Sequence, residues 1–208
     1  MAQRVMHNWR SDRQIRLSKS YKDGGEYKWG ESHLESMAQR NFEYDLDVLS
    51  YKTQPKEYRY IDDKGVTRFY TPDTEVDTTK GPKNVETKPA IFTKGKRAVE
   101  RFNHLRLCFS EAGKAPLSYI TDEDVYQGEQ VANLQKIHHY HRLSIDHICM
   151  DGVICAVGTN PTFGELSQHM KSLGYPKKQT LALLGHQKFI FDYKESLTEK
   201  TQLTLGVH

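Results

Sequence analysis

The stretch Tyr70-Thr71-Pro72-Asp73-Thr74-Glu75-Val76, with Asn84-Val85-Glu86-Thr87-Lys88-Pro89 after a polar loop, decides the expected fold. It predicts a short strand that carries Asp73 after the turn at Pro72, and a second strand that carries Glu86 and Lys88. Side chains two positions apart on a strand point to the same face, so Glu86 and Lys88 should project together. Two acids and a lysine at one sheet edge are typical of a site for a divalent cation and an attacking water. That chemistry indicates phosphodiester hydrolysis.

The segment before this stretch, residues 48–76, alternates apolar and polar residues with the period of β-strands. The pair Gln54-Pro55 should end the first strand, because proline cannot donate to a strand ladder. Asp62-Asp63-Lys64-Gly65 is typical of a hairpin turn, and the glycine is free to take a positive φ. We therefore expect a meander of strands that leads to Asp73.

Helices are expected before and after these strands along the chain. Residues 31–46 should form one, with Ser32 as its N-cap and Glu35 three positions later, a capping-box pattern. Taken alone, Glu35 is better explained as this cap than as a site residue. An amphipathic helix over 100–113 and a strand over 116–120 would complete a βαβ return. The pattern predicts an α/β core with a mixed sheet.

Composition restricts the functional class. The 208 residues are 37% hydrophobic and 11% aromatic, which argues against disorder, and the net charge of +3 permits nucleic-acid binding. The three cysteines form no CxxC pair, which suits reduced thiols, and Cys149 and Cys155 are predicted to be core residues in an apolar segment. Without a signal peptide or a membrane-length apolar run, we expect a soluble cytoplasmic protein with no membrane partner.

Basic residues gather in two segments that are candidates for DNA contact. Residues 1–30 hold seven Lys/Arg and three Asp/Glu, a balance of +4, and predict a basic N-terminal arm. A solvated arm without DNA is an almost equal alternative. The second group precedes the 100–113 helix, where a solvated helix face explains it about as well. The candidate DNA-binding residues are Arg10, Arg13, Arg16, Lys94, Lys96 and Arg97.

The acidic run at 121–124 marks a boundary, and residues 122–208 are expected to form a separate C-terminal domain. A Thr162-capped helix to about 173, a helix over 177–184, and strands over 189–193 and 201–205 indicate a winged-helix-like module. Its near-neutral charge favours docking to a protein partner, with DNA contact as a secondary role. Three histidines in an expected helix over 133–142 are interpreted as surface residues rather than metal ligands: His138, His139 and His141.

Several motifs, in order along the chain, resemble the TnsA family, the endonuclease subunits of heteromeric cut-and-paste transposases. They are Glu31-Ser32-His33-Leu34-Glu35, Leu49-Ser50-Tyr51 with Gln54-Pro55, Tyr70-Thr71-Pro72-Asp73 and Val85-Glu86-Thr87-Lys88-Pro89. Phe163-Gly164-Glu165-Leu166 and Leu197-Thr198 are similar to the family's C-terminal domain. Any one of these motifs is weak, whereas their combination in this order is specific.

The resemblance implies a restriction-endonuclease-like catalytic domain over 31–121. It makes Glu35, Asp73 and Glu86 the ligands of Mg²⁺, for which Mn²⁺ may substitute, and Lys88 the essential lysine. The implied reaction is cleavage of the non-transferred strand at the 5′ ends of a transposon. The implied partners are double-stranded DNA at those ends, a DDE transposase of the TnsB type and an AAA+ ATPase of the TnsC type, in a bacterial nucleoid.

Two other functions stay open on the sequence. One is a free-standing restriction or phage-type nuclease of the same fold, and the other is a DNA-binding adaptor of a transposase without catalytic activity. Each site residue also has a purely structural explanation. Asp73 would cap the turn after Pro72, and Glu86 with Lys88 would form a same-face ion pair on an exposed strand.

Overall fold

The computed structural model describes residues 15–62 and 64–206, and the chain divides into two compact units. The first unit ends at Val125 and the second begins at Tyr126. The short helix α3 (Asp122–Val125) belongs to the first unit, so the division lies four residues after the one expected at 121/122. Val125 is fully buried, and this burial holds the acidic run against the first unit rather than leaving it as a linker.

A four-stranded mixed sheet forms the centre of the first unit, as the sequence predicted. Its order is β3 (Val48–Thr53), β6 (Thr74–Thr78), β7 (Lys83–Thr87) and β8 (Leu117–Ile120). The first two pairings are antiparallel and the last is parallel. The parallel pair is joined by helix α2 (Lys96–Glu111), which starts four residues earlier than expected. The predicted βαβ return is therefore confirmed.

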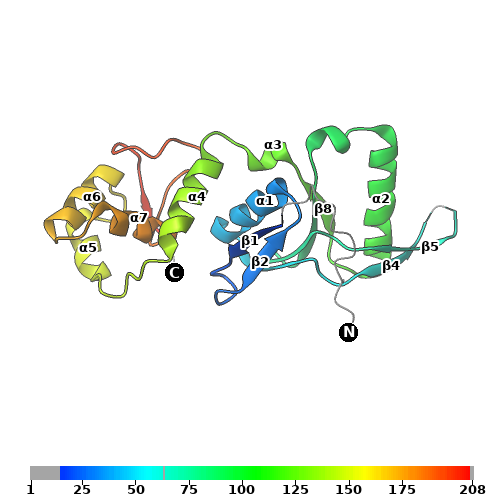
Figure 1. Cartoon of the computed structure of the whole chain (residues 1–208), viewed down its shortest axis with the longest axis horizontal. Helices are drawn as coiled ribbons and strands as arrows, with labels where there is room; N and C mark the ends of the chain where they lie inside the picture. Colours follow the sequence, from blue (N-terminus) through cyan, green and yellow to red (C-terminus); the bar gives the residue numbers. More distant parts are fainter. Residues whose placement is uncertain (1–14, 63, 207–208) are drawn as a thin grey trace. The chain divides into compact units, whose positions relative to one another are not determined.

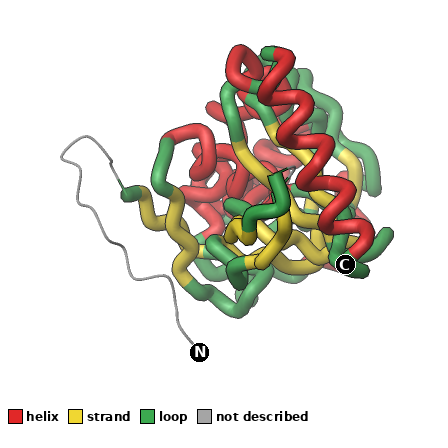
Figure 2. The backbone as a smooth tube through the Cα atoms, turned by 90° about the vertical axis from the view of Figure 1, so that its right-hand side faces the viewer, coloured by secondary structure: helices red, strands yellow, loops and turns green. Residues whose placement is uncertain are grey.

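Helices cover the two faces of this sheet (Figure 1). On one face, Phe42 of α1 (His33–Tyr44) packs on Tyr51, Val76 and Val85. On the other face, α2 contributes its own apolar stripe. Figure 2 shows the backbone from the side on which α2 lies in Figure 1. The α2 cluster consists of Phe102, Leu105, Phe109 and Leu117, with Tyr58, Tyr60, Tyr70 and Tyr119 packed against it. The first unit thus has three layers, with the sheet between α1 and α2.

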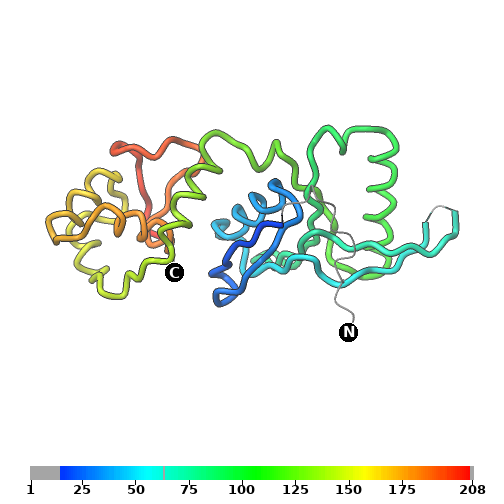
Figure 3. Tube along the Cα trace, viewed as in Figure 1, coloured from blue at the N-terminus to red at the C-terminus, as the bar shows by residue number. Residues whose placement is uncertain are grey.

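The expected meander is wrong in one respect, because the hairpin β4 (Tyr58–Ile61) and β5 (Thr67–Tyr70) forms a separate two-stranded sheet. Gln54 takes a φ of 48° at the end of β3 and redirects the chain there. The hairpin's tyrosines then pack on α2 instead of extending the central sheet. Its loop reaches past α2 in Figure 3. The predicted turn glycine, Gly65, has a φ of 74°.

The expected N-terminal arm is also corrected in part. Strands β1 (Arg16–Lys19) and β2 (Tyr27–Gly30) form an antiparallel hairpin that packs on α1. Glu43 of α1, only 4% exposed, anchors this hairpin by accepting hydrogen bonds from Ser20 Oγ (2.9 Å) and Tyr21 N (2.6 Å). Residues 1–14, with two of the expected DNA-binding arginines, lie outside the described residues.

The second unit contains four helices followed by a short strand pair. Thr162 caps α6, as predicted, and the structure adds a complete capping box with Glu165. The strands β9 and β10 pair antiparallel over two residues each, shorter than expected, so the hairpin that would form a wing is small. The elements are α4 (Gln130–His141), α5 (Met150–Val157), α6 (Phe163–Ser172), α7 (Lys177–Gly185), β9 (Phe189–Ile190) and β10 (Thr204–Leu205).

The prediction of core cysteines in this unit is wrong. Cys149 and Cys155 are both exposed, because α5 turns only Val153 fully inward. The helical period of α5 leaves most residues of this apolar run on the outer faces. Among the described residues, no helix is both long and apolar enough to cross a membrane.

Candidate active site

The register of β6 and β7 brings Asp73 and Glu86 together. Thr74 pairs with Val85 and Glu75 with Asn84, so one further step places Asp73 opposite Glu86 on the same face. The backbone N–H of Thr87 donates to Asp73 Oδ2 at 2.7 Å and fixes this carboxylate at the end of β7. Asp73 itself lies one residue before β6 rather than within it.

Lys88 follows β7 directly and shares the face of Glu86, as the strand period predicted. Its Nζ lies 3.8 Å from Glu86 Oε1, and its side chain is 42% exposed. Its backbone N–H donates to the carbonyl of Ile120 at 2.9 Å, which extends the parallel ladder by one residue. The ammonium group is therefore held beside the carboxylates and still faces solvent.

Glu35 reaches the same end of the sheet from the first turn of α1. Its backbone N–H donates to Ser32 Oγ at 3.1 Å, and its carboxylate accepts from Ser32 Oγ and from the N–H of Glu31, both at 2.9 Å. The predicted helix cap is thus confirmed. Both carboxylate oxygens of Glu35 are engaged in that cap in this structure.

Electrostatics show that the three carboxylates affect one another. The pKa of Asp73 is raised to about 8, first by burial and then by the negative charges of Glu86 and Glu35. Burial also raises the pKa of Glu35, against the hydrogen bonds from residues 31 and 32 that lower it. Like charges held this close are stabilised by a cation, which would reverse the shift at Asp73.

The donor set suits a hard divalent cation, because it offers only carboxylate oxygens next to a lysine. Within residues 15–62 and 64–206, no three His, Cys, Asp or Glu side chains are arranged as a finished metal site. The hydrogen bonds from Glu31 and Ser32 hold the Glu35 carboxylate in the helix cap in this structure. Asp73 and Glu86 are the two acids whose positions the sheet itself sets.

Tyr70 is a site residue that the sequence analysis did not assign. Its hydroxyl donates to Glu86 Oε2 at 2.6 Å, and its ring packs edge-on against Phe109 at 5.9 Å. Burial and the adjacent Glu86 raise the pKa of Tyr70, which keeps the hydroxyl protonated as a donor. The available signal was its place at the end of a strand, three residues before Asp73.

A small pocket of about 80 Å³ opens beside Glu86 and Lys88. Arg101 of α2 lines it together with Phe92 and Tyr119, and neither aromatic residue was assigned to the site from sequence. Phe102 and Tyr119 stack with their ring centroids 3.6 Å apart and form an apolar wall. The pocket therefore combines an acid, two cations and aromatic surface.

The expected DNA-binding residues of the first unit are spread out. Lys94 forms an exposed ion pair with Glu123 at 2.6 Å, while Lys96 and Arg97 are exposed at the start of α2. Arg16 lies on β1, and Arg10 and Arg13 lie outside the described residues.

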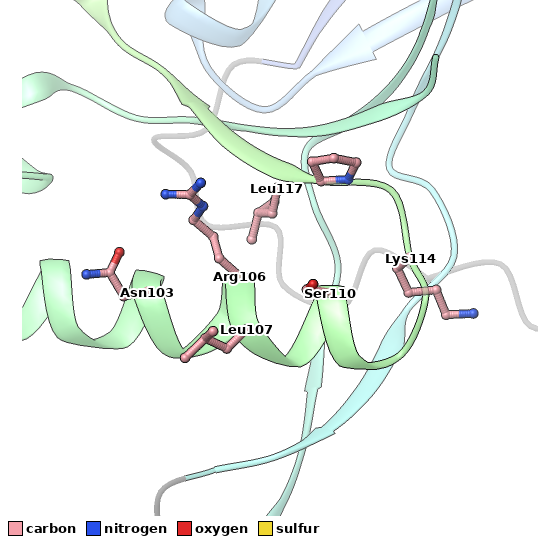
Figure 4. Close-up of a pocket in the computed structure, with 7 residues that line it drawn as sticks. Asn103, Arg106, Leu107, Ser110, Lys114 and Leu117 are labelled. Atoms are coloured by element: carbon pink, nitrogen blue, oxygen red, sulfur yellow. The ribbon is translucent and has the colours of Figure 1, made fainter. Parts of the chain in front are cut away.

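A second hollow, of about 460 Å³, lies between α2 and the segment that leads into β8. Figure 4 shows Arg106 reaching from α2 toward Leu117, while Lys114 points away from the helix. This hollow is lined by no carboxylate and by none of the predicted site residues, so its larger size does not make it the better candidate site.

The expected surface histidines of the second unit have neighbours but no metal-like arrangement among the described residues. His141 stacks on His186 with ring centroids 4.0 Å apart, and His139 contacts Arg142 at 3.1 Å. Comparison of the chain with protein-family models found no match, and comparison with curated proteins found none either.

Proposed function

We propose that this chain is a metal-dependent DNA endonuclease that hydrolyses the phosphodiester bond at the 5′ ends of a transposon. The observation that carries the proposal is the register that sets Asp73 opposite Glu86, with Lys88 on the same face. The electrostatic link from Asp73 to Glu35 adds the third acid. The motifs that resemble the TnsA family supply the narrower assignment to cut-and-paste transposition.

Each site residue would have a separate role in this reaction. Asp73, Glu86 and Glu35 would hold Mg²⁺ or Mn²⁺. Such a cation supplies charge withdrawal from the scissile phosphate and a water of lowered pKa. Lys88, half-exposed beside Glu86, would neutralise the charge that develops on the phosphorane. Tyr70 keeps one oxygen of Glu86 occupied and so orients the other.

The partners follow from the same resemblance. We propose that double-stranded DNA at the transposon ends is the substrate, and that a DDE transposase cuts and joins the opposite strands. The second unit would dock on that transposase or on an AAA+ ATPase, because it carries eight Lys/Arg against seven Asp/Glu. A nearly neutral surface supports protein contact better than a long DNA interface.

A nicking assay tests the proposal. The chain is incubated with a DNA transposon end, Mg²⁺ or Mn²⁺, and the transposase and ATPase of its own element. Nicking on the 5′ side is expected, and Asp73→Asn or Lys88→Ala should reduce it at least about a hundredfold, the scale of a lost electrostatic stabiliser. The exposed Glu57→Gln and Lys83→Ala on β7 are the matched controls. Equal nicking by the site variants and the controls would reject the assignment.

A non-catalytic adaptor is the second candidate, and one observation favours it: both oxygens of Glu35 serve the helix cap. An adaptor would bind transposon ends without cutting under any partner combination. If the chain is an adaptor, Asp73→Asn should leave DNA binding unchanged. If it is a metal-dependent nuclease, the same substitution should weaken Mn²⁺ binding.

A further inference from the structure

Directly after the candidate site residues, the chain forms a short hydrogen-bonded turn that exposes two large apolar side chains. After Pro89 it forms the 3₁₀ helix η1 (Ala90–Phe92), in which Ile91 is 78% exposed and Phe92 is 62% exposed. Water solvates neither side chain favourably, and their position directly follows Lys88. Exposed apolar groups next to a reaction centre are typical of a binding surface.

The turn is rigid enough to present these side chains in one place. The N–H of Phe92 donates to the carbonyl of Pro89 at 2.9 Å. The N–H of Ala90 donates to Asp122 Oδ1 at 2.6 Å, which ties η1 to α3. The hydroxyl of Thr93 donates back to the carbonyl of Ala90 at 2.8 Å. Because the turn is already ordered, binding through it costs little further conformational entropy.

Phe92 is also part of the site itself. It lines the pocket that contains Glu86, Lys88 and Arg101. A strand whose phosphate reaches Glu86 and Lys88 would therefore bring its neighbouring base close to the Phe92 ring. Aromatic side chains offer a stacking surface for any base, because every base has a π-face.

Charge identifies the occupant of this surface as a nucleic acid. Residues 88–101 contain five Lys/Arg and one Asp/Glu, and α3, to which η1 is hydrogen-bonded, adds three acids, so the local balance is weakly positive. The nearby Glu123 of α3 pairs with Lys94, so it does not repel a phosphate independently. An apolar ring in a pocket that also contains Lys88 and Arg101 matches a polyanion with flat apolar faces better than it matches a neutral protein surface.

We propose that Ile91 and Phe92 form an apolar wedge that holds an unstacked base beside the phosphate being cut. The substrate class is then DNA whose strands are locally unpaired at the cleavage position, either before binding or by the action of the wedge. This proposal rests on the proposed function, because the site supplies the position of the phosphate. Proteins that insert apolar side chains at a base step pay for unstacking with new contacts, and the step that opens most readily is preferred.

Binding of two DNA probes tests the wedge without any cleavage. One probe is a fluorescein-labelled duplex with a three-nucleotide mismatched bubble, and the other is the same duplex fully paired. Fluorescence anisotropy is measured with Ca²⁺ in place of Mg²⁺. The wild-type chain should bind the bubble more tightly than the paired duplex. Ile91→Ala/Phe92→Ala should weaken bubble binding by about fivefold to a hundredfold, the range for a lost base stack, and change paired binding little.

Two further variants separate stacking from other effects. Phe92→Trp keeps an aromatic face and should keep the preference for the bubble. Phe69→Ala on β5 removes a phenylalanine that is also 62% exposed, and it should leave the preference unchanged. A loss of the same size in Phe69→Ala would overturn the proposal, and so would a double variant that still prefers the bubble.

The two hypotheses fail separately. Wild-type chain that prefers the bubble but never nicks DNA would reject the nuclease and leave the wedge as a DNA-binding device. Nicking that depends on Asp73, combined with equal binding of both probes, would reject the wedge and retain the nuclease.

Discussion

The hydrogen bond from Tyr70 to Glu86 offers a direct test of how the site is held. Tyr70→Phe removes one oxygen atom and leaves the ring that packs on Phe109. The hydroxyl donates at 2.6 Å to a carboxylate whose side chain is only 17% exposed. The substitution therefore removes a charge-assisted hydrogen bond without opening a cavity in the apolar layer.

Its expected size can be worked from this contact. A hydrogen bond to a charged group contributes about 1.5–3 kcal/mol, and a lost partner of a metal ligand typically costs about 10- to 100-fold in metal affinity. At about 1.4 kcal/mol per tenfold change, the two ranges agree. Tyr70→Phe should therefore raise the dissociation constant for Mn²⁺ by about one to two orders of magnitude.

Calorimetric titration with Mn²⁺ measures this directly, and the Mg²⁺ concentration that gives half-maximal nicking measures it during reaction. Tyr60→Phe is the control, because Tyr60 lies on the adjacent strand β4 and packs on the same α2 cluster. The nicking defect of Tyr70→Phe should shrink at high Mg²⁺, since positioning of a ligand and not the chemistry is impaired. An unchanged metal affinity in Tyr70→Phe, or an equal loss in Tyr60→Phe, would refute the reasoning.

Three other predictions concern stability and pH. Glu43→Leu should lower the free energy of unfolding by about 3–5 kcal/mol in urea titrations, because the donors that bind this carboxylate lose their acceptor. Glu57→Gln, at an exposed position, should change it by less than about 0.5 kcal/mol. Thr162→Ala removes the cap of α6 and should cost about 1 kcal/mol, measured by thermal unfolding. In EDTA, the free energy of unfolding should fall as the pH rises from about 4 toward 8. In the folded chain the pKa of Asp73 is raised to about 8, so Asp73 keeps its proton over this range. In the unfolded chain Asp73 releases that proton at its ordinary pKa near 4, which favours unfolding. Asp73→Asn should flatten that decline in urea titrations at pH 5, 6.5 and 8, and a decline of equal slope in the variant would assign it to other groups.

The sequence by itself determined the features that depend on neighbours along the chain. The two-residue period of a strand predicted Lys88 beside Glu86, and in the structure Lys88 Nζ lies 3.8 Å from Glu86 Oε1. The spacing of Ser32 to Glu35 determined one helix cap, and the position of Thr162 determined another. These features were predictable because the interacting groups are at most four residues apart.

Tertiary structure decided what depends on distant segments. The turn at Gln54 sends β4 and β5 onto α2 and delivers the hydroxyl of Tyr70 to Glu86, sixteen residues later. The buried carboxylate of Glu43 converts part of an expected basic arm into a hairpin packed on α1. Asp73 acquires its raised pKa only when the β6–β7 register and the start of α1 bring other carboxylates near. The sequence specifies each acid, but burial and the approach of like charges arise only when the segments pack together.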